Sequence, residues 1–119
     1  MDRKWWKRTI LKQCRLVGTY NTAFDSVIDT LSQLLEQRDN AYAVFMEAGG
    51  EVCVEHTQDR GAKNMRKNPM LQVWMDLNAQ ALAYWRDLGL TPAGLKRINE
   101  TAMQKPKESA LAKALREVG

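Results

Sequence analysis

The residue types best suited to chemistry in this 119-residue chain are scattered, and their spacing fits no catalytic site. Cys53, Glu55, His56 and Asp59 are potential metal ligands, but the Cys-x-x-His pair lacks the second pair of a zinc site. A metal-dependent nuclease would need more converging carboxylates. Because the chain has one histidine, no Ser-His-Asp or Cys-His arrangement is supported. We therefore expect no metal and no catalytic residue.

The glycine pair Gly89 and Gly94 has the spacing of a phosphate-binding loop but not its chemistry. In a true loop a lysine follows the second glycine at once, because its ammonium group reaches the phosphates. Leu95 occupies that position here, and Thr91-Pro92 already explains the segment as a helix start. We predict that the protein binds no nucleotide cofactor and is not an enzyme.

Basic residues offer a different chemistry, because they gather in three blocks around an acidic stretch. Residues 1–16 have a net charge of +5, residues 17–59 of −7, residues 60–69 of +4 and residues 92–119 of +3. Such blocks suit the neutralisation of DNA phosphates. The candidate DNA-binding residues are Arg3, Lys4, Lys7, Arg8, Lys12, Arg15, Arg60, Lys63, Arg66, Lys67, Lys96 and Arg97. The alternatives are solvated surfaces and, for the first block, a helix on a membrane surface.

Composition indicates one globular protein with short appendages, since 45% of the residues are hydrophobic and 27% are charged. No apolar run approaches the roughly 20 residues that span a membrane. Cys14 and Cys53 are too few for a disulfide framework, so we expect reduced thiols. We expect a cytosolic protein without a membrane partner.

The elements that position these residues are mainly helical. An amphipathic helix is expected over residues 3–17, and a long helix with Thr22 as its N-cap extends to Gly49-Gly50. Residues 51–57 alternate as in a short strand, and the basic residues 63–67 are expected to form a loop. Asn68-Pro69 opens a helix ending at Leu88, and Thr91-Pro92 opens another that ends near Gln104. A weak helical tail is expected over residues 107–118.

The helix from Pro69 to Leu88 is apolar around most of its circumference, so one chain offers too little to cover it. The long helices should pair as a hairpin, and a neighbouring copy should cover the remainder. The alternative is that the shorter helices fold back and complete a monomer. The expected interface residues are Trp74, Leu77, Ala81, Tyr84, Trp85 and Leu88.

The predicted fold is therefore mainly α. It is a long antiparallel helical hairpin with an irregular or short-β connection, flanked by shorter helices, in a ring-like homo-oligomer. We divide it into a basic N-terminal helix (1–18), a helical core and oligomerisation domain (19–105) and a C-terminal helical tail (106–119).

The order of these features resembles that of the bacteriophage terminase small subunits. The most specific signs are Asn68-Pro69 at the start of one helix and Leu88-Gly89-Leu90-Thr91-Pro92 at its end. The resemblance implies a non-catalytic protein that binds double-stranded viral DNA, forms rings and presents the genome to the large terminase subunit, an ATPase and nuclease. It would act in the cytoplasm of an infected or lysogenic bacterial host. The alternatives are a helix-turn-helix DNA-binding regulator and a helical adaptor that binds no DNA.

Overall fold

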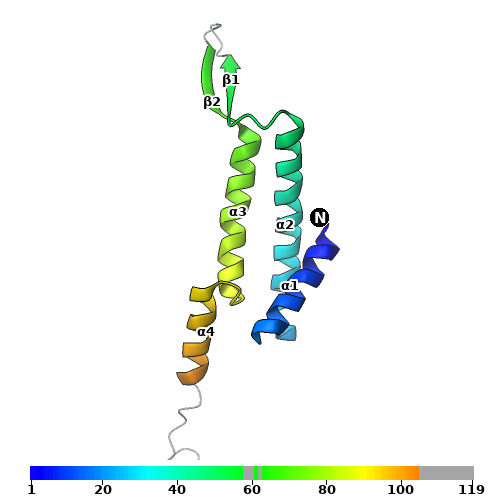
Figure 1. Ribbon diagram of the computed structural model, residues 1–119, viewed down its shortest axis with the longest axis vertical. Helices are drawn as coiled ribbons and strands as arrows, with labels where there is room; N and C mark the ends of the chain where they lie inside the picture. The colour runs from blue at the N-terminus through cyan, green and yellow to red at the C-terminus, as the bar shows by residue number, and fades with distance from the viewer. Residues whose placement is uncertain (58–60, 62, 105–119) are drawn as a thin grey trace, which may run out of the picture.

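The computed structural model describes residues 1–57, 61 and 63–104, and the expected tail helix over residues 107–118 lies outside them. The chain forms α1 (Arg3–Val17), a 3-10 turn (Thr22–Phe24), α2 (Asp25–Glu47), β1 (Cys53–Thr57), β2 (Lys63–Lys67), α3 (Pro69–Asp87) and α4 (Pro92–Gln104). Helices α2 and α3 lie side by side as an antiparallel hairpin (Figure 1). The strands extend from one end of this hairpin, α1 packs along α2, and α4 follows α3 at the other end. The prediction of a mainly helical fold with a short-β connection is confirmed.

Helix α1 has a defined start and stop. The Asp2 carboxylate accepts a hydrogen bond from the Trp5 backbone N–H at 2.8 Å, which satisfies a donor that the helix leaves free. Gly18 follows Val17 at φ 78°, a left-handed conformation that glycine adopts without strain. Both ends of α1 are therefore fixed, so residues that share a face of the helix point in the same direction along its length.

The expected N-cap of the long helix, Thr22, is wrong, because the residue before α2 is Phe24, which makes no side-chain cap hydrogen bond. The side chain of Asn21 instead accepts a hydrogen bond from the Ala23 N–H at 2.9 Å and opens the 3-10 turn, after which α2 begins at Asp25. Asparagine and threonine both cap helix starts, so adjacent candidates cannot be ranked by type alone.

The connection between the long helices is an antiparallel two-stranded ribbon, in which Cys53 pairs with Lys67 and Thr57 pairs with Lys63. The prediction of a loop over residues 63–67 is therefore wrong. The segment lacks the apolar alternation of a half-buried strand, and its Asn64, Met65, Arg66 and Lys67 side chains are exposed. Backbone pairing with β1, rather than burial of one face, makes it a strand.

The core lies where three helices meet. It contains Ile10 and Cys14 of α1, Ile28, Leu31 and Leu35 of α2, Ala81 of α3 and Leu88 at the α3 end. One apolar stripe of α3 packs against α2, and within the protomer Ala81 is buried while Met70, Trp74, Leu77 and Tyr84 are half-buried. Half-buried aromatic residues, Trp6, Tyr84 and Trp85 among them, pack around this core.

A tight corner joins α3 to α4. The Thr91 hydroxyl accepts a hydrogen bond from the Gly94 N–H at 3.0 Å and so caps the start of α4. A side chain at position 94 would overlap the carbonyl oxygen of Arg86, so this close approach requires glycine. The corner also contacts the α1–α2 connection, where the Thr19 hydroxyl donates to the Leu88 carbonyl at 2.8 Å.

Candidate nucleic-acid interface

Four cations form an outward row along α1. Lys4, Arg8, Lys12 and Arg15 follow one another at spacings of four, four and three residues, which places them on one helical face. All four are exposed, and within the described residues none pairs with a carboxylate. The Arg15 guanidinium lies 5.0 Å from the centre of the Tyr20 ring, an aromatic contact that leaves its charge unneutralised. The row can therefore bind an anionic surface.

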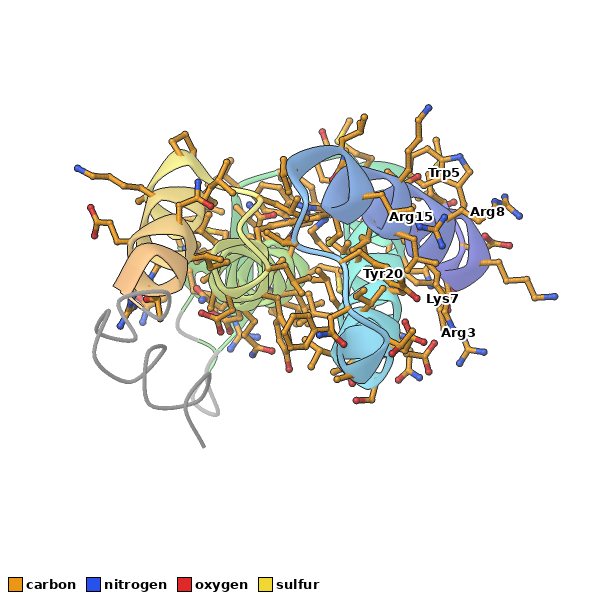
Figure 2. The ribbon with its side chains drawn as sticks, turned by 90° about the horizontal axis from the view of Figure 1, so that it is seen from below. Arg3, Trp5, Lys7, Arg8, Arg15 and Tyr20 are labelled. Carbon is orange, nitrogen blue, oxygen red and sulfur yellow. The ribbon has the colours of Figure 1, made fainter. Side chains whose placement is uncertain are left out.

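The other two cationic residues of the helix, Arg3 and Lys7, contact acidic residues of α2, Arg3 through its backbone and Lys7 through its side chain. The Lys7 ammonium is 3.5 Å from the Asp29 carboxylate, and the Arg3 backbone N–H donates to Glu36 at 2.6 Å. Figure 2 shows Arg3, Lys7 and Arg8 on the flank of the molecule formed by α1. The structure thus separates the predicted basic face into an open outer row and an inner edge next to carboxylates.

Asp39 of α2 fixes the orientation of α1. Its carboxylate accepts a hydrogen bond from the Trp6 indole N–H at 2.7 Å and lies 3.2 Å from the Arg38 guanidinium. The same guanidinium stacks over the Trp6 ring at 5.3 Å, and Trp6 contacts Trp85 of α3 with ring centres 6.3 Å apart. Sequence reasoning missed this role because Trp6 and Asp39 are 33 residues apart, beyond any local pattern.

The second basic block belongs to the β-ribbon. Arg66 and Lys67 are exposed on β2, which also contains Lys63, while Arg60 lies outside the described residues. The ribbon projects from one end of the helical hairpin, away from α4 at the other end (Figure 1).

The third block, Lys96 and Arg97, is exposed on α4. Helix α4 lies on the opposite flank of the molecule from α1 (Figure 2). One protomer therefore does not bring the three predicted blocks together into a single surface.

Helix α3 carries a second apolar stripe beside the one that faces the core. Leu71, Met75, Asn78, Leu82 and Trp85 recur at spacings of four, three, four and three, the repeat of a helix–helix seam. Met75 and Leu82 are 41% and 52% exposed. An open groove of about 360 Å³ follows this stripe, bordered by Trp74, Met75, Asn78, Ala79, Leu82 and Trp85.

The predicted interface residues divide between these two stripes. Ala81 and Leu88 are 1% and 3% exposed and belong to the protomer core. Leu77 and Tyr84 are half-buried, and Tyr84 packs against that core. Trp74 and Trp85 are also half-buried, and both border the open groove.

Other chemistry finds little support in the described part of the chain. Residues 1–57, 61 and 63–104 contain no group of three side chains that could hold a metal ion, and Asp59 lies outside them. None of the described helices is long and apolar enough to cross a membrane. Gly89 ends α3 at φ 74° and Gly94 allows α4 to approach α3, so both glycines have structural roles.

Comparison with known proteins places the chain in a family. A search of curated proteins and a search of solved structures find no match. The model of the family described as phage terminase, small subunit, matches residues 3–105, which include α1 to α4 and the ribbon. The chain therefore belongs to the phage terminase small subunit family, whose role lies in phage DNA packaging.

Proposed function

We propose that this protein binds double-stranded viral DNA as a homo-oligomer and presents it to the large terminase subunit for packaging. The observation that carries the proposal is the outward row Lys4, Arg8, Lys12 and Arg15, four exposed cations on one face of a firmly held helix. Phosphate contacts of this kind position a protein on DNA without reading its sequence. The ATPase and nuclease activities then belong to the large subunit, and this subunit acts without catalysis in the cytoplasm of the bacterial host.

The acidic edge of α2 supports this orientation of α1. Asp29, Glu36 and Asp39 lie beneath the inner side of α1, where they contact Lys7, the Arg3 backbone and Trp6 respectively. Carboxylates repel phosphates, so DNA approaches from the opposite, outer side. Lys7, whose ammonium is paired with Asp29, then contributes less to DNA binding than a residue of the outer row does.

The second stripe of α3 supports assembly. Packing a neighbouring helix against Leu71, Met75, Leu82 and Trp85 removes large apolar side chains from water, each contributing roughly 1.5–3 kcal/mol when fully buried. Asn78, whose side chain accepts a hydrogen bond from Arg38 at 3.2 Å, is a polar position within this seam. Such a residue favours one register of pairing over others. Closed repetition of the contact gives the ring-like homo-oligomer that we propose.

The salt dependence of DNA binding tests the DNA-binding role. Each neutralised phosphate contributes about 0.9 to the slope of log K against log salt, so the outer row accounts for about 3.6 per engaged protomer. Arg8→Ala removes an open cation and should lower that slope by about 0.9 per engaged protomer. Lys7→Ala, a matched change on the same helix, should leave the slope nearly unchanged.

Fluorescence anisotropy with a labelled DNA duplex measures these slopes. If the wild-type protein shows no affinity for DNA at low salt, the proposed DNA-binding role is wrong. If Lys7→Ala and Arg8→Ala reduce the slope equally, the assignment to the outer row is wrong while DNA binding itself stands.

A further inference from the structure

The β-ribbon formed by Cys53–Thr57 and Lys63–Lys67 stands clear of the helical body (Figure 1). Its described side chains pack against little: Cys53, Glu55, Asn64, Met65, Arg66 and Lys67 are exposed, and Val54 is half-buried. An isolated two-stranded ribbon is marginally stable in water, so such an element usually gains stability from a partner. We therefore expect the ribbon to contact a binding partner.

The root of the ribbon is held firmly although its body is exposed. The Asn68 backbone N–H donates to the Val52 carbonyl at 2.8 Å, and its side-chain amide donates to the Glu51 carbonyl at 2.9 Å. The side-chain oxygen of Asn68 also accepts the Met70 N–H at 3.0 Å and caps α3. One buried residue thus ties both strand ends to the start of α3 and sets the direction in which the ribbon projects.

The charges of the ribbon favour an anionic partner. Strand β2 contains Lys63, Arg66 and Lys67, whereas β1 contains a single carboxylate, Glu55. Residues directly opposite in an antiparallel pair share a face, so Glu55 lies on the face of Met65 and not on that of Arg66. Asn64 and Arg66, two positions apart on β2, share the other face with Val54.

That second face matches the geometry of DNA bases. Residues two apart on a strand are separated by about 6.8 Å, which equals two base-pair steps of about 3.4 Å each. Arginine pairs with the guanine edge and asparagine with the adenine edge in the major groove. The major groove is wide enough for a two-stranded ribbon, and the minor groove is about half as wide.

Resting on the DNA-binding role proposed above, we propose that the ribbon enters the major groove of DNA with Arg66 and Asn64 facing the base edges. Lys67, on the opposite face of the ribbon and next to its root, is placed for a phosphate at the groove wall. The outer row of α1 supplies sequence-independent affinity, and the ribbon supplies discrimination between bases. Asn68 is a positioning residue that aims the ribbon.

The proposal is tested by pairing a protein change with a DNA change. The affinity of the full-length protein is measured for a short GC-rich duplex and for the same duplex with a guanine analogue that has carbon in place of N7. Wild-type protein should bind the analogue duplex about 5-fold or more weakly, because Arg66 loses an acceptor. Arg66→Ala should bind both duplexes equally. Arg66→Lys retains the positive charge but not the two-pronged geometry, so it should keep the salt slope and discriminate less than the wild type.

Arg86→Ala, an exposed arginine of α3 away from the ribbon, is the charge-matched control and should discriminate as the wild type does. The mass of each variant assembly is measured in the same buffer. The ribbon proposal is overturned if wild-type protein binds DNA but ignores the analogue, or if Arg66→Ala still discriminates. It is also overturned if Arg66→Ala breaks the assembly apart, since the ribbon then pairs with another copy. If wild-type protein binds neither duplex, the DNA-binding role itself falls.

Discussion

At the scale of single residues, a few side chains decide how the basic helix is presented. The Asp39 side chain is 25% exposed and accepts the indole N–H of Trp6, which half-buries a polar group that water would otherwise solvate. Arg38 completes the contact by stacking on the same ring. The orientation of the outer row therefore depends on a residue that carries no positive charge and lies on another helix.

Asp39→Ala leaves the Trp6 indole N–H without its partner and should lower the free energy of unfolding by about 1–3 kcal/mol. Urea denaturation followed by tryptophan fluorescence measures the change. The control is Asp76→Ala, which removes an exposed carboxylate that accepts a hydrogen bond from Gln72 and should change stability by less than about 0.5 kcal/mol. Equal losses in the two variants would contradict the role given to Asp39.

Cys14 provides a pH-dependent test of the core. Burial raises the pKa of its thiol, and a hydrogen bond with Thr19 opposes this increase in part. The unfolded thiol therefore loses its proton first as the pH rises past about 8.5. The contribution of the neutral thiol to stability is complete below that pH and is lost as the pH rises through the folded-state pKa.

The wild-type protein should thus lose stability more steeply than Cys14→Ala does as the pH rises above the unfolded pKa of the thiol. Urea midpoints at several pH values measure the two slopes, and other titrating groups cancel in the comparison. Cys53→Ala, at an exposed cysteine, should keep the wild-type slope. Parallel slopes for wild type and Cys14→Ala would show that the thiol is not buried as described.

At the scale of elements, the helices could be predicted from the sequence, but the segments that pack against one another were harder to predict. The Asn68-Pro69 and Thr91-Pro92 starts and the Gly18 and Gly89 stops act over one helical turn, so local sequence identifies them. Strand β2 was missed because Lys63–Lys67 shows no apolar alternation and depends on its partner strand. The difference between the α1 cations also depends on α2. Lys7 and Arg8 have the same charge, but only Lys7 lies next to a carboxylate of α2, that of Asp29.

For helix α3 too, the sequence did not indicate which side packs against a neighbouring segment. Its apolar circumference was evident in the sequence, but the expected interface set mixed Ala81 and Leu88, which belong to the protomer core, with Trp85 of the second stripe. The second stripe, one residue further along the chain, borders the open groove. Two heptad-like stripes on one helix are equivalent as patterns, and only the position of α2 distinguishes them.

Leu82→Asp places a charge in the centre of this second stripe and should prevent assembly while the protomer stays folded, because Leu82 is 52% exposed within one chain. Sedimentation velocity reports the assembly and circular dichroism reports the helices. Ala83→Asp, the neighbouring exposed position outside both stripes, should assemble as the wild type does. An assembled Leu82→Asp protein would move the proposed interface away from this face.

At the scale of the whole molecule, the basic segments lie far apart within one chain. The ribbon is at one end of the helical hairpin, and α1 and α4 lie on opposite flanks of it (Figures 1 and 2). A single protomer would therefore offer DNA separate contacts of modest strength. The closed oligomer that we propose would place many copies of each segment side by side, and such linked contacts raise the overall affinity without any new interaction.

The native mass of the wild-type 119-residue chain, measured by sedimentation equilibrium at micromolar concentration, tests this account most directly. We expect a single species whose mass is a fixed multiple of 13.6 kDa, as closed repetition of the α3 contact requires. A species that stays at 13.6 kDa across the concentration range would contradict the account, because the second stripe of α3 would then be exposed to solvent without a partner.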